Sequence, residues 1–238
     1  MSACVVGLAM AAMLVSARPV AAQSTIMNIP TTDTAAPGKV YFEFDFLKQM
    51  PPAEDSSWTT YVPRVVIGVT DRVEVGANYG VTQYADDGGT STVFQPNAKV
   101  KLFADDDAGL AVAAGVIGYV PSDSGDRFGQ IYGVVSKKIA DGPRFHFGGF
   151  GAISGEFEDK GGAIFGYEQP LSAKVTFVTD LLTGNNFWGY LTPGVSVALP
   201  HSALLNIGYS IGWNELTGDG DPDNRNNALF VYYGIVLN

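Results

Sequence analysis

Hydrophobic and polar residues alternate along most of the chain after Lys39, and this alternation predicts strands with two different faces. The stretch DRVEVGANYGV (71–81) is an example. Its valines and its tyrosine fall on one side of an extended chain, whereas Arg72, Glu74 and Asn78 fall on the other. Such a strand suits a half-exposed sheet of a soluble protein, and it equally suits a membrane strand that faces lipid on one side and water on the other.

Turn-forming clusters divide this region into twelve predicted strands, most of them about 10–12 residues long, the length that a tilted strand needs to cross a bilayer. We place them at about 39–48, 57–69, 72–83, 92–103, 109–120, 128–139, 143–154, 161–169, 172–182, 186–198, 202–213 and 226–238. The connections alternate between short turns and longer polar loops such as QMPPAEDSS and NELTGDGDPDNR. Short turns at one rim and longer loops at the other are typical of outer-membrane barrels.

Three features favour a membrane barrel over a soluble sheet whose apolar face would turn inward. An export signal precedes the strands, strand lengths are nearly constant while loop lengths alternate, and aromatic residues lie near the long-loop ends of the strands, as in an interfacial girdle. These residues are Trp58, Tyr61, Phe94, Phe187, Trp188 and Trp213. We therefore predict an all-β fold, namely a monomeric transmembrane antiparallel up-and-down β-barrel of about 12 strands, with about 10 or 14 strands and a secreted soluble β-protein as the alternatives.

The N-terminus has the features of an export signal. Residues 3–16 are apolar but too few to span a bilayer as a helix, and Val20 and Ala22 occupy the minus-three and minus-one positions of a cleavage site. We predict that residues 1–22 are a signal peptide and that residues 39–238 form the barrel. Residues 23–38 are then a short segment that stays in the periplasm or folds back into the lumen and narrows it. This organisation predicts a location in the cell outer membrane.

Composition and charge exclude several classes of protein. The 238 residues are 46% hydrophobic and 16% charged, with the single cysteine Cys4, which excludes a disordered chain and a disulfide scaffold. Loss of the signal removes Arg18 from the 14 Lys and Arg, leaving 13 against 24 Asp and Glu, a formal charge of −11. Nucleic acid is not an expected partner, because its phosphates need a basic surface. The expected partners are outer-membrane lipids, lipopolysaccharide, the barrel-assembly machinery and a small-molecule solute.

Three prolines fall within the predicted strands. Pro63, Pro96 and Pro193 each lie in the first half of a strand that runs toward a short turn. Proline cannot donate a hydrogen bond to a neighbouring strand. In a closed barrel we expect a bulge, a bend or a local gap in the pairing at each of these positions.

If the apolar faces contact lipid, the opposite faces place charged residues in the lumen. The predicted lumenal set has similar numbers of acidic and basic residues, so the lumen is expected to be nearly neutral. Its members are Glu43, Asp45, Arg64, Arg72, Glu74, Lys99, Lys101, Arg144, His146, Glu168, Lys174 and Asp180. A charge ladder across the first four strands could form a constriction that filters solutes, or ion pairs that only fill and stiffen the interior.

The sequence offers little for catalysis or metal binding. His146 has no serine at a neighbouring spacing and His201 lies in a short turn, so we predict no enzyme activity. Asp219, Asp221 and Asp223 recur at every second position of a polar loop, a spacing that suits a structural Ca²⁺, although a solvated acidic loop is the simpler interpretation. No other cofactor is expected.

The segment PRVVIGVTDRVEVGANYG (63–80), together with Trp58 and the stretch NIPTTDTAAPGKVYFEFDF (28–46), resembles bacterial outer-membrane β-barrel transporters of the phenol meta-cleavage-pathway type, distant relatives of hydrophobic-compound channels. The resemblance implies uptake of small hydrophobic or aromatic molecules. The last predicted strand ends in Asn238, where the usual assembly signal ends in Phe. Our functional prediction is a passive channel for small molecules, and the alternative is a structural or surface-interaction barrel with a filled lumen and no transport.

Overall fold

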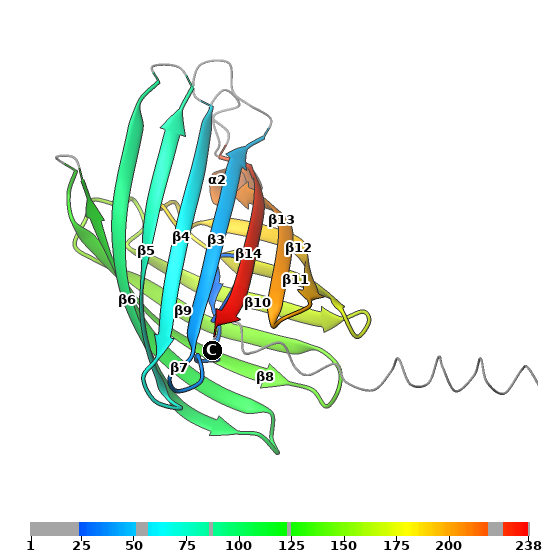
Figure 1. Cartoon of the computed structure of the whole chain (residues 1–238). Helices are drawn as coiled ribbons and strands as arrows, with labels where there is room; N and C mark the ends of the chain where they lie inside the picture. The colour runs from blue at the N-terminus through cyan, green and yellow to red at the C-terminus, as the bar shows by residue number, and fades with distance from the viewer. Residues whose placement is uncertain (1–23, 51–56, 86–87, 123–124, 219–225, 238) are drawn as a thin grey trace, which may run out of the picture.

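The computed structural model describes residues 24–50, 57–85, 88–122, 125–218 and 226–237. The predicted signal peptide, residues 1–22, lies outside these ranges. Twelve strands form a closed barrel around a short N-terminal segment (Figure 1). Among the described residues, no helix has the length and apolar character needed to cross a membrane.

The strands of the barrel wall follow one another in chain order, each antiparallel to its neighbours, and the last strand pairs with the first. Their bounds are β3 (Val40–Gln49), β4 (Trp58–Gly68), β5 (Val73–Tyr84), β6 (Thr90–Asp105), β7 (Leu110–Pro121), β8 (Phe128–Lys138), β9 (Arg144–Ile153), β10 (Gly161–Pro170), β11 (Val175–Leu182), β12 (Tyr190–Leu199), β13 (Ala203–Gly212) and β14 (Ala228–Leu237). Two shorter strands, β1 (Thr25–Ile26) and β2 (Ile29–Pro30), form a hairpin of their own, and the helix α2 (Trp213–Thr217) follows β13. The predicted all-β, antiparallel up-and-down barrel of twelve strands is confirmed.

The two faces of the wall differ as the alternation predicts, with the apolar side chains outside. On β5, Glu74 and Asn78 point inward and are 3% and 4% exposed, whereas Val75 and Tyr79 on the outer face are 40% and 42% exposed. Other large apolar side chains exposed on the wall are Phe44, Val65, Ile67, Phe94, Val100, Val116, Ile131, Val135, Phe147, Phe165, Ile207, Tyr209 and Tyr233. So much exposed apolar surface is stable against lipid and unfavourable against water. The alternative of a soluble sheet with its apolar face turned inward is therefore wrong.

The connections divide the barrel into two unlike rims. At the rim where β3 begins and β14 ends, called the short-turn rim below, the connections are short turns such as 69–72 and 200–202. The opposite, long-loop rim carries longer connections such as 154–160 and 183–189. The strand β6 extends beyond its predicted end, and a bulge between Lys101 and Phe103 shifts its register with β7.

Each of the three prolines expected to disturb the strands interrupts the pairing along one edge of its strand. Between β4 and β5, the paired residues pass from Tyr61 to Arg64 and skip Pro63. The pairing likewise skips Pro96 between β6 and β7 and Pro193 between β12 and β13, while the other edge of each strand stays paired at the proline. Proline lacks the N–H that pairing would require. The predicted local gaps are confirmed.

Ile207, in the middle of β13 and 40% exposed on the outer face, tests the contact of the wall with lipid. We expect Ile207→Arg to lower the free energy of unfolding by about 2–4 kcal/mol, because a charge at the bilayer midplane is costly. The control is Ile139→Arg at the short-turn rim, where the isoleucine is 51% exposed and a cost of about 0–1 kcal/mol is expected. Denaturant unfolding in lipid bilayers measures both variants, and equal costs at the two positions would contradict a wall that spans the membrane.

Candidate functional site

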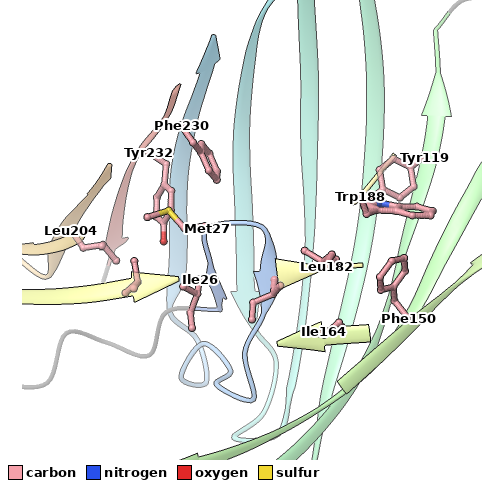
Figure 2. Close-up of a cluster of buried hydrophobic side chains, with 12 residues drawn as sticks. Ile26, Met27, Tyr119, Phe150, Ile164, Leu182, Trp188, Leu204, Phe230 and Tyr232 are labelled. Carbon is pink, nitrogen blue, oxygen red and sulfur yellow. Dashed lines mark hydrogen bonds between the residues drawn. The ribbon is translucent and has the colours of Figure 1, made fainter. Parts of the chain in front are cut away.

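Residues 24–38 are called the N-terminal segment below. Residues 24–35 lie inside the barrel, and Ala36, Pro37 and Gly38 are exposed beside the end of β4. Its hairpin β1–β2 reaches the inner wall at β10 and β11. Ile26 and Ile29 are buried, with 1% and 0% of their surface exposed. Figure 2 shows Ile26 and Met27 among buried side chains that come from several strands of the wall.

Glycines on the inner wall make room for the hairpin. A Cβ atom at Gly166 would meet Cδ1 of Ile29, and a Cβ atom at Gly194 or Gly208 would meet Cε of Met27. The apolar side chains of the hairpin therefore lie directly against the backbone of the wall. A larger residue at Gly166 would take the space that Ile29 occupies.

Asp180 on β11 holds the turn of the hairpin. Its Oδ2 accepts hydrogen bonds from the backbone N–H groups of Asn28 (2.6 Å) and Ile29 (2.9 Å). The side-chain amide of Asn28 donates to Oγ1 of Thr192, 2.7 Å away. These bonds fix the turn to two neighbouring strands of the wall, β11 and β12.

Glu74 and Lys99 bind two separate parts of the N-terminal segment. Nζ of Lys99 lies 3.0 Å from Oε1 of Glu74 and donates to the backbone oxygen (2.9 Å) and to Oγ (2.8 Å) of Ser24. Oγ of Ser24 donates to Glu74, whose Oε2 also accepts a hydrogen bond from the N–H of Ala35 (2.7 Å). Because Glu74 and Lys99 are 3% and 4% exposed, each charge depends on the other, and the loss of one partner would cost about 3–5 kcal/mol.

Arg64 connects the N-terminal segment to β3 and β5. Its Nη1 lies 2.8 Å from Oε1 of Glu43 and donates to Oγ1 of Thr25 (2.9 Å), and its Nε donates to Oδ1 of Asn78 (3.1 Å). Asp45 follows Glu43 on the same face of β3 and is 6% exposed. Oδ1 of Asp45 has no hydrogen-bond partner in the part of the chain that the structure describes. The positive charge of Arg64 interacts with the carboxyl groups of both Glu43 and Asp45.

Arg144, the first residue of β9, binds the middle of the N-terminal segment. Its Nη1 and Nη2 donate to Oδ2 (2.6 Å) and Oδ1 (2.9 Å) of Asp33, and Nη2 also donates to Oγ1 of Thr32 (2.9 Å). Burial by itself would raise the pKa of Asp33, but the hydrogen bonds and the positive charge of Arg144 outweigh it and hold this pKa below its ordinary value. Asp33 is therefore ionised at neutral pH, and the ion pair stabilises the docked segment.

His146 on β9 links the same region to β8 and β10. Its Nδ1 lies 2.7 Å from Oγ of Ser136 and its Nε2 lies 2.8 Å from Oε1 of Glu168, while Oγ1 of Thr32 donates to Oγ of Ser136 (2.9 Å). The sequence showed no serine near His146, but the register of the two strands pairs Ser136 with His146 directly. Ser136 and His146 are 2% and 0% exposed, and Thr32 occupies the serine hydroxyl. This serine, histidine and carboxylate therefore attach the segment, although hydrolases use the same three groups for nucleophilic attack.

The structure brings most of the predicted lumenal residues together, with two exceptions. It places Arg72 and Lys174 in exposed short turns, because β5 begins one residue and β11 three residues later than predicted, and this corrects the expectation that they line the lumen. Lys101 is half-buried beside the bulge of β6. The residues that pair with one another or with the N-terminal segment are Glu43, Arg64, Glu74, Lys99, Arg144, His146, Glu168 and Asp180, and Asp45 lies beside the first two.

Asp33 is a lumenal charge that the alternation could not reveal, because it lies outside the strands of the wall. Among the described residues, and leaving His146 aside, six acidic side chains in the lumen stand against four basic ones. They are Asp33, Glu43, Asp45, Glu74, Glu168 and Asp180 against Arg64, Lys99, Lys101 and Arg144. By formal charge the described lumen thus holds two more acidic than basic side chains, because Asp33 joins the set while Arg72 and Lys174 leave it.

The lumen also contains a cavity of about 530 Å³. The N-terminal segment contributes Met27 and Asn28 to its lining, and the strands β3–β6 contribute many polar side chains. Trp58 and Tyr84, at the long-loop ends of β4 and β5, also line it. The cavity thus extends from the N-terminal segment to the long-loop rim.

Aromatic side chains form one side of this cavity. Trp188, from the connection between β11 and β12, is 8% exposed, and its Nε1 donates to Oη of Tyr119 on β7, 2.8 Å away. Figure 2 shows the rings of Trp188 and Tyr119 lying together. Phe187 also lies against both rings. Trp58, Phe187 and Trp188 therefore line the lumen, which corrects the expectation that they belong to an outer aromatic girdle.

The predicted calcium ligands Asp219, Asp221 and Asp223 lie outside the described residues. Within the described ranges, no group of three or more His, Cys, Asp or Glu side chains could hold a metal ion.

The closed wall, the apolar exterior and the charged lumen define a transmembrane β-barrel of the outer-membrane type. An outer membrane channel from Pseudomonas putida F1 is similar, with a TM-score of 0.55 and 11% identity over 87% of this chain and 98% of that chain. The KdgM porin in complex with disordered oligogalacturonate is similar too, with a TM-score of 0.53 and 8% identity over 84% of this chain and 99% of that chain. No family model and no curated protein sequence matches the chain. At these identities the similarity is one of fold, and it agrees with the distant resemblance to outer-membrane channels seen in the sequence.

We expect Gly166→Val to weaken the docking of the N-terminal segment, because the new side chain would take the space of Cδ1 of Ile29. Overpacking of this kind costs about 1–3 kcal/mol, which corresponds to about 5- to 150-fold faster hydrogen exchange of residues 24–38. Gly133→Val is the control, since a Cβ atom at Gly133 would meet no atom within 4 Å. Exchange that stays at the wild-type rate in Gly166→Val would show that the hairpin does not depend on this contact.

We expect Asp33→Asn to lower the free energy of unfolding at neutral pH by on the order of 1 kcal/mol, because the charged hydrogen bonds to Arg144 are lost. The pKa of Asp33 falls when the segment docks, so the ionised carboxylate stabilises the docked state at pH values above the undocked pKa of about 3.8. This stabilisation is lost as the pH falls through the lower pKa of the docked state. The difference between wild type and variant should stay constant from about pH 8 to pH 5 and shrink toward zero below about pH 3.8. Denaturant unfolding at each pH measures it, and a difference that grows on acidification would contradict the ion pair.

Proposed function

We propose that the protein is a passive channel of the outer membrane for small molecules and that the N-terminal segment controls the passage. The observation that carries this proposal is the position of the segment, which crosses the lumen beside a cavity of about 530 Å³. The strands β1 and β2 pair with each other, and the twelve strands of the wall form a closed ring without them. The segment can therefore leave the lumen without breaking the hydrogen bonds that close the wall.

The attachments of the N-terminal segment suit a reversible plug. They consist of ion pairs and hydrogen bonds of side chains such as Arg144, Asp180 and Lys99, together with the buried Ile26 and Ile29. A single hydrogen bond contributes about 0.5–1.5 kcal/mol in net terms, because water replaces the lost partner. Displacement of the segment into a wet lumen thus costs far less than opening a strand pair inside the bilayer.

The lining of the cavity supports a small solute that is at least partly apolar. Tyr119, Phe187 and Trp188 face the cavity, and polar side chains of β3–β6 complete its lining. Its volume of about 530 Å³ lies within the range of about 300–1,000 Å³ that is usual for small-molecule sites. The resemblance of segments 28–46 and 63–80 to transporters of the phenol meta-cleavage-pathway type supports the same class of solute.

An outer-membrane location is supported by the apolar exterior of the wall, by the predicted signal peptide and by the fold shared with outer-membrane channels. In this location the exposed side chains of residues such as Phe147 and Phe165 would contact lipid acyl chains. Lipopolysaccharide at the long-loop rim and the barrel-assembly machinery during insertion are the further partners that we propose.

A structural barrel with a filled lumen is the second candidate. The burial of Ile26 and Ile29 favours it, because these side chains pack as tightly as residues of a permanent core. A segment that never leaves the lumen would leave the cavity closed at the short-turn side. The two candidates therefore differ in whether the segment moves.

A disulfide between the N-terminal segment and the wall tests this movement. Oγ1 of Thr32 and Oγ of Ser136 lie 2.9 Å apart, so the sulfur atoms of Thr32→Cys and Ser136→Cys would lie within reach of a disulfide of about 2.05 Å. In planar bilayers we expect the oxidised double variant to lose at least about nine tenths of the wild-type conductance and to regain it on reduction, because the locked segment blocks the passage.

The matched control is a disulfide that joins two strands of the wall. Oγ1 of Thr60 and Oγ1 of Thr82 also lie 2.9 Å apart, and neither residue belongs to the N-terminal segment. Thr60→Cys combined with Thr82→Cys should conduct equally in the oxidised and reduced states. Full conductance of the oxidised Thr32–Ser136 variant would contradict the plug, and a folded wild-type barrel that is silent under all conditions would favour the filled lumen.

A further inference from the structure

One of the amide side chains that line the cavity is buried without a protein partner. Gln130 on β8 is 5% exposed, and its side-chain amide forms no hydrogen bond with another described residue. Buried polar groups are nearly always hydrogen-bonded, because an unpaired one has lost its water without compensation. The amide of Gln130 therefore lacks a partner that a molecule in the cavity can supply.

A chain of hydrogen bonds fixes which end of a second amide faces the cavity. Nε of Arg64 donates to Oδ1 of Asn78 (3.1 Å), and a guanidinium group can only donate. Nδ2 of Asn78, a residue that is 4% exposed, then donates to Oε1 of Gln95 (3.1 Å). Nε2 of Gln95 lies beside Gly80, where a Cβ atom would be 3.7 Å away, and forms no hydrogen bond with another described residue. Gln95 thus offers the cavity hydrogen-bond donors and no free acceptor.

Both amides border the strand that carries the aromatic side of the cavity. The register places Gln95 opposite Tyr119 and Gln130 opposite Ile117, on the two sides of β7. Side chains that lie directly opposite each other have Cβ atoms about 4.5–5.5 Å apart. The ring centroid of Tyr119 is 5.8 Å from that of Phe187, which lines the cavity and is 58% exposed. The two amides and this exposed ring therefore surround one part of the cavity, on the scale of a single substituted benzene.

The charged side chains beside the cavity are engaged with one another. Glu74 and Lys99 form one ion pair, Arg64 pairs with Glu43, and Asp45 is hydrogen-bonded to Glu43. A charged solute would have to leave water without gaining a free counter-charge here, which is costly. The site therefore favours an uncharged molecule.

We infer that the cavity binds small uncharged aromatic molecules that carry a carbonyl oxygen, with the amides of Gln95 and Gln130 as donors to this oxygen and Phe187 against the aromatic ring. A carbonyl oxygen accepts up to two hydrogen bonds and donates none, which matches the donors of Gln95. A pure hydrocarbon gains the ring contact and leaves the amides unpaired. This inference rests on the proposed function in taking such molecules as the transported solutes, although binding itself requires no passage.

Acetophenone and ethylbenzene test the hydrogen bond, because they differ mainly in a carbonyl group that replaces a methylene group. Equilibrium dialysis of the purified, folded barrel against protein-free detergent micelles measures both affinities and corrects for partition into detergent. Gln130→Met removes an amide but no hydrogen bond of the protein, and should lower the ratio of acetophenone to ethylbenzene affinity about 2- to 12-fold, the worth of one hydrogen bond.

Two further variants complete the comparison. Gln95→Glu keeps an oxygen for Asn78 but loses the donors, and should lower the same ratio by a similar factor. Gln83→Met is the control, since Gln83 is exposed on β5 and does not line the cavity, and should leave the ratio unchanged. Retention of the wild-type ratio in both Gln130→Met and Gln95→Glu would overturn the inference, and loss in one alone would assign the carbonyl to that amide.

Two other probes and one variant test the remaining features of the site. Benzoate keeps the ring and adds a charge, whereas acetone keeps the carbonyl and lacks the ring, and both should bind more weakly than acetophenone. Phe187→Ala should weaken acetophenone and ethylbenzene by the same factor. Benzoate binding as tightly as acetophenone would overturn the preference for uncharged molecules, and acetone binding as tightly would overturn the ring contact.

Infrared spectroscopy of the wild type keeps the inference testable if neither amide variant folds. The carbonyl stretch of bound acetophenone should lie at a lower frequency than in a hydrocarbon solvent, because a hydrogen bond weakens the C=O bond. A stretch at the hydrocarbon position would overturn the inference. These measurements are independent of conductance. A barrel that binds acetophenone through the amides but conducts nothing retains the site and loses the proposed channel, whereas a conducting barrel without this binding retains the channel and loses the site.

Discussion

Inside a bilayer, only the protein itself can pair with a backbone N–H or C=O group, and this requirement shapes the whole molecule. The strand β14 therefore pairs with β3 from Ala228–Gln49 to Leu237–Val40, which leaves the sheet without a free edge. Closure sends every second side chain into the lumen. The charged residues of the inner face must then find partners within a narrow space, and the organisation of the interior follows from that need.

The N-terminal segment supplies many of these partners. Its backbone N–H groups compensate carboxylates of the wall at Asp180 and Glu74, and its Asp33 compensates the guanidinium of Arg144. Segment and wall are thus complementary in charge, as two binding surfaces are. The twelve strands of the wall close into a ring without β1 and β2, so the segment contributes side-chain partners to the lumen but no strand to the wall.

The two halves of the lumen are lined by different kinds of side chain. Toward the short-turn rim, charged residues such as Lys99 and Arg144 hold the N-terminal segment, while toward the long-loop rim rings such as Trp188 and Tyr119 line an open cavity. A molecule that enters from the long-loop rim would meet these rings first and the N-terminal segment afterwards. Selectivity and closure would then depend on different residues, so each could be altered without the other.

The sequence by itself determined the strands, the lipid-facing side of each and the sites where pairing fails at Pro63, Pro96 and Pro193, because alternation and the missing proline N–H are local properties of the chain. Only the tertiary structure decided which charges meet. Asp33 and Arg144 are 111 residues apart, and Ser136 meets His146 through strand register, which no periodicity encodes. Later strand starts, by one residue in β5 and by three in β11, move Arg72 and Lys174 from the lumen to the rim, and the inward position of Trp188 follows from a loop that carries no alternation. The local alternation of residues thus determines the strands of the wall, whereas barrel closure and strand register determine which side chains meet in the lumen.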